Sequence, residues 1–330
     1  MTSLPKVYVG LPIQETGLEL LRGKFEFRIW TDEGAPSRET LFEELKDADG
    51  LISGLTFRVD DELMAASPKL KVISNYAVGY DNIDVTAATK RGIYVTNTPD
   101  VLTAATADLA FLLILATARR AIEANEFMRS GKWKIWGPDL LVGMEVSGST
   151  IGIIGMGKIG AAVAKRASGF GMKILYADAL RRTDIEDSIG AQFVSLEELL
   201  RESDMVTVHC LLNEQTRNMI GEDQFKMMKK TAIFVNTARG AIVDQKALYK
   251  ACAEKWIWAA GLDVYEKEPV PLDDPILKLT NVTTLPHIAS ASNVSRNGMA
   301  RKAAINLINA LEGKRPPDLL NPEIWTAGKQ

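Results

Sequence analysis

Only two histidines occur in the 330-residue sequence, and each follows a run of apolar residues that is typical of a buried strand. An imidazole can give or take a proton near neutral pH, because its ordinary pKa is about 6.5. His287 follows Pro286 at the end of one such run, and His209 ends another. Ligands bind at the carboxyl ends of the strands in open α/β sheets, so both histidines are candidates for acid–base chemistry. A histidine satisfied within the core is the alternative for each.

Two charged residues are suited to accompany His287. Arg239 lies in the segment NTARG at residues 236–240, and Glu268 lies just beyond another predicted strand. Hydride transfer to a carbonyl creates an alkoxide that needs a proton, and an imidazolium can supply it. A nearby carboxylate orients the imidazole and favours its charged form, and an arginine offers a fork for a carboxylate substrate. A surface ion pair for Arg239 and a solvated loop charge for Glu268 remain the alternatives.

A glycine-rich motif of the form GxGxxG follows an apolar strand and opens an alanine-rich helix. Asp178 stands at the end of the next strand, 23 residues after the first glycine. This context is the dinucleotide-binding fingerprint, in which glycines allow a tight turn, close backbone approach to a pyrophosphate and close helix packing. The phosphates would bind unpaired amides at the start of the helix, and a merely structural turn is the alternative. The predicted cofactor-binding residues of this segment are Gly155, Gly157, Lys158, Ile159, Gly160 and Asp178.

The residue type at position 178 also predicts which dinucleotide binds. The carboxylate of Asp178 can accept hydrogen bonds from the adenosine ribose hydroxyls and would repel a 2′-phosphate, which favours NAD over NADP. Arg181 and Arg182 follow closely and can reduce that repulsion, which leaves NADPH possible. We therefore predict that NADH is the preferred cofactor.

Strand-like and helix-like segments alternate along most of the chain, which predicts an α/β fold with parallel sheets covered by helices on both faces. A first series has strands at residues 6–10, 26–30, 50–53, 71–74 and 93–96, with helices that begin near Ile13, Ser37, Asp60 and Asp84. A second series has strands at residues 151–154, 173–177, 192–194, 205–209, 232–236, 259–264 and 282–285. Most of these are continuous apolar runs, as expected for strands buried on both faces.

The last helix, predicted over residues 292–311, follows the second series. The first series lacks a closing helix of its own, so this tail is expected to return to it. We therefore predict two doubly wound, Rossmann-like domains, of which the first is discontinuous. The substrate-binding domain would comprise residues 1–99 and 288–330, and the NAD-binding domain would comprise residues 100–287. Hinges are expected at the two crossings, and the substrate is expected in the cleft between the domains.

One long helix is predicted over residues 104–129, and an irregular arm at residues 130–148 follows it with Trp133 and Trp136. Exposed tryptophans beside an apolar helix are typical of a contact surface. We predict a homodimer that forms through this helix and arm, residues 104–148. Packing within the monomer is the alternative.

Composition and charge argue against several classes of protein. Apolar residues make up 46% and charged residues 25% of the chain, which is typical of a folded domain and not of a disordered one. The net charge is −3 with scattered Lys and Arg, unlike a nucleic-acid binder. The longest apolar stretch, residues 109–118, is about half of the ~20 residues that span a bilayer. Two cysteines are too few for a disulfide framework or a zinc site. We expect a cytoplasmic protein with no metal, membrane or nucleic-acid partner.

The sequence resembles the D-isomer-specific 2-hydroxyacid dehydrogenase family over nearly its whole length. The matching segments are residues 75–82 (NYAVGYDN), 97–103 (NTPDVLT), 155–160, 237–240 (TARG), 261–264 (GLDV) with Glu268-Pro269, and Pro286-His287. The first segment and the glycine-rich motif, together with Trp136-Gly137-Pro138, most resemble the glyoxylate/hydroxypyruvate reductase branch.

The resemblance implies a role for each residue of the proposed catalytic group. Arg239 would bind the substrate, Glu268 would support the histidine, and His287 would donate the proton. Formate dehydrogenases of the family carry Gln in place of this Glu, which argues against them. Backbone amides around Val78 and Gly79 would bind the substrate carboxylate, because a glycine lets the chain approach an anion closely. The predicted substrate-binding residues are Leu55, Val78, Gly79, Arg239 and His287.

The resemblance also implies further contacts with the cofactor, and Asp263 would meet the nicotinamide amide. Other residues at positions that usually line the cofactor are Thr106, His209, Leu211, Thr216, Thr237 and Ala238. Where the family commonly has His-x-Pro-Leu-Thr, this chain has HCLLN at residues 209–213, so its loop near the adenine is expected to differ.

These features lead us to expect NAD(P)H-dependent reduction of a small 2-keto acid, glyoxylate or hydroxypyruvate, to the D-2-hydroxy acid. The alternative from another class is an NADH-sensing, corepressor-like binding protein of the same fold. Within the enzymes, D-lactate, 2-ketogluconate and phosphite dehydrogenases remain open. A pocket distinguishes such substrates by only about 1–3 kcal/mol per methylene, so the sequence does not choose among them.

Overall fold

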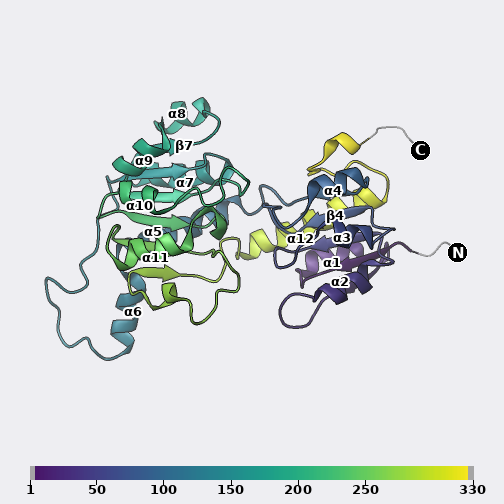
Figure 1. Cartoon of the computed structure of the whole chain (residues 1–330), viewed down its shortest axis with the longest axis horizontal. Helices are drawn as coiled ribbons and strands as arrows, with labels where there is room; N and C mark the ends of the chain where they lie inside the picture. The colour runs from purple at the N-terminus through teal and green to yellow at the C-terminus, as the bar shows by residue number, and fades with distance from the viewer. Residues whose placement is uncertain (1–3, 326–330) are drawn as a thin grey trace. The chain divides into compact units, whose positions relative to one another are not determined.

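The computed structural model describes residues 4–325, and the chain divides into two compact units (Figure 1). Unit 1 contains the residues up to Leu102 and those from Ala291 onward. Unit 2 is the continuous segment Thr103–Ser290. The boundaries expected from the sequence, after residues 99 and 287, each lie three residues earlier.

Unit 1 contains a five-stranded parallel sheet with the strand order β2-β1-β3-β4-β5, which is one of the two common orders of doubly wound folds. Its strands β3 and β4 are buried along their whole length, including their polar residues Ser53, Ser74 and Asn75. The elements are β1 (Lys6–Val9), α1 (Glu15–Leu21), β2 (Glu26–Ile29), α2 (Arg38–Leu45), β3 (Gly50–Ser53), α3 (Asp61–Ala65), β4 (Val72–Asn75), α4 (Val85–Lys90), β5 (Tyr94–Thr96), α12 (Asn293–Leu311) and the short 3₁₀ helix η3 (Pro322–Ile324).

Helix α12 closes unit 1, although it comes from the end of the chain. It packs against α1 and against strands β3 and β4. The hydroxyl of Ser74 in β4 donates a hydrogen bond to the carbonyl oxygen of Ala303 in α12 at 2.9 Å. The segment after the helix pairs with β5 through an antiparallel bridge between Thr96 and Leu319. The predicted return of the tail to the first series of strands is confirmed.

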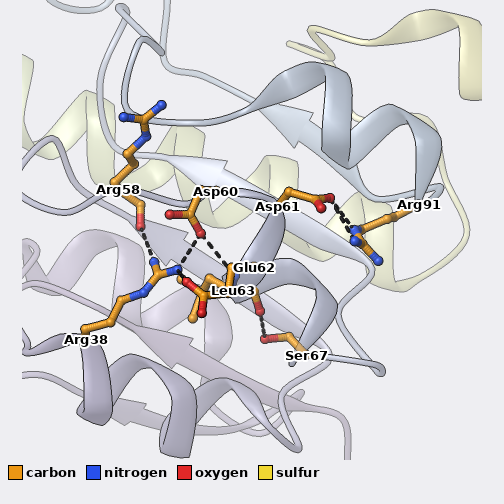
Figure 2. Close-up of polar contacts among 8 residues, drawn as sticks. All are labelled: Arg38, Arg58, Asp60, Asp61, Glu62, Leu63, Ser67 and Arg91. Atoms are coloured by element: carbon orange, nitrogen blue, oxygen red, sulfur yellow. Dashed lines mark hydrogen bonds and ion pairs between the residues drawn. The ribbon is translucent and has the colours of Figure 1, made fainter.

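The connection between β3 and α3, residues 54–60, is fixed by polar contacts at the start of the helix. Asp60 caps α3 by accepting a hydrogen bond from the backbone N–H of Leu63 at 3.1 Å. Figure 2 shows Arg38, the first residue of α2, reaching across to Asp60 and Glu62, with distances of 2.5 and 2.9 Å. These contacts fix the end of the connection that leads into α3, and the predicted substrate residue Leu55 lies at its start.

Unit 2 contains a seven-stranded parallel sheet with the strand order β12-β11-β10-β9-β6-β7-β8. The strand order reverses beside β6, and this switch point is where doubly wound sheets bind dinucleotides. The elements are α5 (Thr103–Ala118), α6 (Ala121–Arg129), β6 (Thr150–Ile154), α7 (Lys158–Gly169), β7 (Lys173–Ala177), α8 (Thr183–Ile189), β8 (Gln192–Phe193), α9 (Leu196–Glu202), β9 (Met205–Val208), α10 (Glu222–Met227), β10 (Ile233–Asn236), η1 (Gly240–Ile242), α11 (Gln245–Ala253), β11 (Ala259–Leu262), η2 (Pro275–Lys278) and β12 (Val282–Thr284).

The sheet of unit 2 carries an apolar core on each face. Phe234 of β10 belongs to one core, with Phe225 of α10, and the two rings pack edge to face at 5.2 Å. The neighbouring Val235 points to the other core, with Phe111 of α5 and Val163 of α7. The α/β fold with two doubly wound parallel sheets, predicted from the alternation of strands and helices, is confirmed.

The predicted single helix over residues 104–129 is wrong, because the structure contains two helices, α5 and α6. Arg120 between them has the left-handed φ angle of 53°. The carbonyl oxygen of Ala118 accepts its hydrogen bond from the backbone N–H of Met144, in the returning end of the arm, at 2.8 Å. A Cβ at Gly143 would lie 2.2 Å from that same oxygen, so the arm packs where the helix would have continued. Within residues 4–325, no helix has both the length and the apolar character needed to cross a membrane.

Candidate active site

The glycine-rich loop, residues 155–160, connects β6 to α7 beside the switch point of the sheet. Gly155 has a φ angle of 97°, and a Cβ there would lie 2.5 Å from the backbone nitrogen of Cys210. A Cβ at Gly160 would lie 2.0 Å from the carbonyl oxygen of Gly155, whereas a Cβ at Gly157 would meet no atom within 4 Å. The outer glycines are therefore required for packing. The middle one leaves space before the first amides of α7, where helices bind phosphate.

Asp178 follows β7 and lies against this loop. One carboxylate oxygen accepts a hydrogen bond from the backbone N–H of Met156 at 2.6 Å, and the other accepts one from that of Leu180 at 3.1 Å. The carboxylate is thereby fixed beside the start of α7. A residue that contacts the adenosine ribose in this fold has to lie there.

The two arginines after Asp178 are held by carboxylates of α8. Arg181 binds Glu186 through Nε and Nη2 at 2.9 and 2.8 Å. Arg182 binds Asp184 in the same manner, at 2.8 and 2.7 Å. These hydrogen bonds are the main reason that the pKa values of both carboxyl groups lie below their ordinary values. Each guanidinium group therefore already faces a negative charge.

His209 follows β9, and its surroundings separate it from the other histidine. Its Nε2 lies 2.9 Å from the hydroxyl oxygen of Thr207. Burial lowers the pKa of His209 to about 3, so its imidazole is uncharged at neutral pH. An uncharged imidazole cannot act as the proton donor, so His209 is better suited to a structural or cofactor-lining role.

The loop after β9 contains Leu211 and Thr216, both predicted to line the cofactor. The hydroxyl of Thr216 donates a hydrogen bond to the carbonyl oxygen of Leu211 at 2.6 Å, and the Leu211 side chain is 55% exposed. Leu180, which the sequence did not single out, is 74% exposed in the turn after β7. Its signal in the sequence is an apolar residue inside an otherwise polar turn. Exposed leucines on either side of β6 offer an apolar surface that suits a flat aromatic ring.

Three more predicted cofactor residues lie near the carboxyl end of the sheet or at the start of α5. Thr106 belongs to the first turn of α5 and is buried. Thr237 follows β10 and is also buried, and among the described residues its hydroxyl oxygen has no hydrogen-bond partner. The backbone N–H of Ala238 donates to the side-chain oxygen of Asn236 at 3.0 Å, which fixes the turn that leads to Arg239.

Arg239, Glu268 and His287 follow three neighbouring strands, β10, β11 and β12. The Nδ1 atom of His287 lies 2.6 Å from Oε2 of Glu268. The other oxygen of Glu268 accepts a hydrogen bond from the backbone N–H of Tyr265 at 2.9 Å. Arg239 donates through Nη1 to the carbonyl oxygen of Ala238 at 2.8 Å. The histidine and the carboxylate are thus in direct contact.

The electrostatics of the His287–Glu268 pair suit proton donation. Burial by itself would raise the pKa of Glu268, but the hydrogen bond and charge of His287, with smaller contributions from Tyr265 and Arg239, hold it below its ordinary value. An ionised carboxylate at Nδ1 orients the ring and leaves Nε2 as the nitrogen that can exchange a proton with a ligand. The side chains of His287 and Glu268 are 29% and 36% exposed, so the pair remains accessible.

Asp263 fixes the backbone that carries His287. Its carbonyl oxygen accepts the N–H of His287 at 2.9 Å, and its two carboxylate oxygens accept those of Ile288 and Ala289 at 2.8 and 2.7 Å. His287 has a φ angle of 54°, a left-handed conformation that residues other than glycine rarely adopt. Burial raises the pKa of Asp263, and these backbone hydrogen bonds oppose that effect. The sequence pointed only to a cofactor contact for Asp263, so this positioning role was missed.

In unit 1, Val78 and Gly79 lie in the loop after β4, and side-chain amides hold their carbonyl groups. Asn97 donates to the carbonyl oxygen of Val78, and Asn75 donates to that of Gly79, both at 2.8 Å. Within residues 4–325, the backbone N–H groups of Val78 and Gly79 donate no hydrogen bond. Adjacent unpaired N–H groups form a site that suits an anion. Leu55 follows the neighbouring strand β3 and is partly exposed.

Comparison with known proteins identifies the family. Residues 111–289 match the model of the D-isomer specific 2-hydroxyacid dehydrogenase family, NAD binding domain. A glyoxylate reductase of Korarchaeum cryptofilum is 56% identical over 97% of this chain and 97% of its own length. The TT0316 protein from Thermus thermophilus has a similar structure, with 41% identity, a TM-score of 0.90, and coverage of 96% of this chain and 99% of that one.

A second solved structure is an NADPH-dependent glyoxylate/hydroxypyruvate reductase from Sinorhizobium meliloti in complex with NADP and malonate. It is 32% identical with a TM-score of 0.83, and the match covers 96% of this chain and 97% of that one. The chain therefore belongs to the D-isomer-specific 2-hydroxyacid dehydrogenase family and is an NAD(P)-dependent oxidoreductase.

Proposed function

We propose that the protein reduces glyoxylate or hydroxypyruvate to the corresponding 2-hydroxy acid, with NADH as the preferred cofactor. The observation that carries the proposal is the 2.6 Å contact between His287 and Glu268 at the carboxyl end of the sheet that also carries the glycine-rich loop. An imidazole supported by a carboxylate is suited to protonate the oxygen that forms when a carbonyl is reduced. The similarity to glyoxylate reductases supports glyoxylate as a substrate.

Each residue of the site has its own role in the reaction. A bound nicotinamide cofactor would supply the hydride. His287 gives its proton from Nε2 to the developing alkoxide, and Glu268 stabilises the positive charge that the imidazole carries before that transfer. The planar guanidinium of Arg239 binds the substrate carboxylate and polarises the carbonyl group. In unit 1, the backbone N–H groups of Val78 and Gly79 are likewise suited to a carboxylate.

Several residues of unit 2 fit a dinucleotide. The glycine-rich loop leaves open space at Gly157, and the hydroxyl of Thr237 is buried with no partner among the described residues. Asp178 suits the ribose hydroxyls of NAD. The carboxylate of Asp263 keeps lone pairs beyond those that its backbone contacts use, and these suit the nicotinamide amide. The NADPH-dependent relative supports NADPH as the alternative cofactor.

We also propose that the protein is a homodimer in which a second copy covers an apolar surface of unit 2. This surface, which we call the arm surface, is formed by α5, α6 and the arm that projects from the unit (Figure 1). Its apolar side chains are exposed to an extent that is unusual for a monomer. They are Leu112, Ile122, Met128, Trp133, Ile135, Trp136, Leu140 and Val142.

The absorbance of NADH, followed after mixing the purified protein with glyoxylate, tests the proposed activity. We expect NADH to be consumed with glyoxylate and with hydroxypyruvate, and more slowly with pyruvate or 2-ketogluconate. Hydroxypyruvate should give D-glycerate, which chiral chromatography distinguishes from the L isomer. The same assays with NADPH measure the cofactor preference. A protein that binds NADH but consumes it with none of these acids would contradict the proposal and favour the corepressor-like alternative.

A further inference from the structure

Both polar groups in the backbone of Met156 are bound by side chains from the connection between β7 and α8. The N–H of Met156 donates to the carboxylate of Asp178 at 2.6 Å. Its carbonyl oxygen accepts a hydrogen bond from Nη1 of Arg182 at 2.8 Å. Met156 lies between Gly155 and Gly157, and glycines leave a backbone free to change its conformation. The two side chains therefore bind both backbone polar groups of a residue whose own side chain is buried in the core of unit 2.

Arg182 is itself held at both of its ends. Its Nε and Nη2 bind the two carboxylate oxygens of Asp184 at 2.8 and 2.7 Å. Its backbone N–H donates to the hydroxyl oxygen of Tyr176 at 2.7 Å, and that hydroxyl in turn binds Glu186 at 2.6 Å. The ring of Tyr176 is fully buried in the core of unit 2. The position of the guanidinium is thus fixed by the backbone, by a carboxylate and by the glycine-rich loop.

We propose that Arg182 is a positioning residue of the cofactor site, which holds the glycine-rich loop in the shape that presents its amides to a pyrophosphate. It acts through Met156 and does not serve as a ligand for a 2′-phosphate. A guanidinium has two edges that can bind an oxyanion in bidentate geometry, and in Arg182 the Nε–Nη2 edge is engaged with Asp184 while Nη1 binds the loop. A phosphate would have to share these nitrogens with Asp184 and Met156. The inference rests on the proposed cofactor site. From the sequence, Arg182 was expected to reduce the repulsion between Asp178 and a 2′-phosphate, and the positioning role is a different one.

Titrations with NADH and with NADPH on the full-length protein test this proposal. We expect Arg182→Ala to raise the Kd for both cofactors by about tenfold, because a loop with one anchor lost presents its amides less well. The ratio of the two Kd values should stay within about twofold of the wild type. In steady-state assays KM for NADH should rise in step, while kcat at saturating NADH and the KM for glyoxylate should stay unchanged.

Two further variants complete the experiment. Asp184→Asn keeps the arginine but weakens its fixation, so it should raise both Kd values in the same direction by a smaller factor. If Arg182→Ala fails to fold, Asp184→Asn still tests the proposal. Arg201→Ala is the matched control, because Arg201 forms an exposed pair with Glu197 on α9 of the same unit and the contacts of that pair do not involve the loop. Its Kd values should equal those of the wild type.

Three outcomes would overturn the proposal. A loss of affinity confined to NADPH would identify Arg182 as a ligand of the 2′-phosphate. Unchanged Kd values for both cofactors would show that the loop does not need this anchor. A lower melting temperature with normal binding would show that the contacts serve stability alone. Binding of NADH by the wild type in the same titrations tests the proposed cofactor site separately, so the two failures can be told apart.

Discussion

His287 is fixed by two different carboxylates, which act on different parts of the residue. Asp263 binds the backbone of residues 287–289 and so holds a left-handed conformation that would otherwise be unfavourable. Glu268 binds Nδ1 of the ring. Asp263 therefore fixes the backbone of the histidine, and Glu268 fixes the orientation of its ring.

Removal of the charge of Glu268 should change the pH dependence of the proposed reduction. In Glu268→Gln the amide keeps the size of the side chain but no longer favours the imidazolium. The wild type should lose activity at low pH, where the carboxylate of Glu268 takes up a proton, whereas Glu268→Gln has no carboxylate to titrate there. We therefore expect kcat/KM of Glu268→Gln to be lower by roughly 10²-fold near neutral pH and to lack this acid limb. The measurement is the rate of NADH consumption with glyoxylate between pH 5 and 10.

Glu266→Gln is the matched control, since Glu266 is exposed and lies two residues away in the same loop. Its profile should follow that of the wild type, and a Glu268→Gln profile that coincides with both would remove Glu268 from the proposed role. The lowered pKa of Glu268 also predicts how the activity of the wild type falls at low pH. The stabilisation from the ion pair is present above the ordinary carboxyl pKa and is lost as the pH falls through the lowered value.

At the scale of elements, the loop after β4 owes its shape to side chains that lie outside it. Asn97, which follows β5, binds the carbonyl of Val78, and Asn75 at the end of β4 binds that of Gly79. The carbonyl groups are thereby turned away from the N–H groups that we propose as the anion site. Side chains at the ends of two neighbouring strands thus fix the conformation of one loop.

Loss of the Asn97 side chain should weaken substrate binding more than catalysis. In Asn97→Ala the carbonyl of Val78 loses its donor, the loop relaxes, and KM for glyoxylate should rise by roughly tenfold. KM for NADH and the kcat at saturation should change little. Asn97→Asp retains the shape of the side chain but replaces the N–H donor by an oxygen, so it should show at least the same loss. If KM for glyoxylate is unchanged in both variants, the amides of Val78 and Gly79 do not bind the carboxylate.

The sequence predicted the elements well because their signals are local. The segments of all twelve strands were recognisable, and the observed bounds lie within two residues of the predicted ones. The helix starts at Ser37 and Asp84 were also predicted correctly, since each side chain accepts a hydrogen bond from a backbone N–H three residues later. In the site, the contact between His287 and Glu268 agrees with the pairing that residue chemistry and the family resemblance suggested.

The features that the sequence missed depend on contacts between distant segments. The break at Arg120 arises because the arm returns to bind Ala118, and no pattern inside the helical stretch records that contact. Asp263 and Arg182 bind main-chain groups, which every residue possesses. The residue types of their partners therefore do not reveal these contacts. The predicted role of Asp263 came from the family resemblance, and that of Arg182 from the charge of its side chain.

At the scale of the whole molecule, the arm surface predicts the oligomeric state. Leu112 of α5 is 52% exposed on this surface and lines a hollow with Phe111, Leu115 and Phe170, which the ion pair of Arg166 with Asp108 also borders. We expect the wild type to be a dimer by light scattering. Leu112→Asp should be monomeric at the same concentration, because dimerisation would bury a further carboxylate in place of an apolar side chain.

Leu272→Asp is the control for this prediction. Leu272 is 93% exposed in unit 2 and lies outside the arm surface, so the same substitution there should leave the dimer intact. A wild type that behaves as a monomer, or a Leu112→Asp variant that stays dimeric, would contradict the proposed contact.

The placement of α12 has a consequence for how the chain is made. During translation residues 4–102 of unit 1 leave the ribosome before unit 2, whereas the helix that packs against β3 and β4 follows unit 2. Unit 2 is continuous and can fold as soon as its own residues are available. Unit 1 is therefore begun before unit 2 and completed after it, and a chain that terminates before residue 293 would leave its sheet without the helix that packs against β3 and β4.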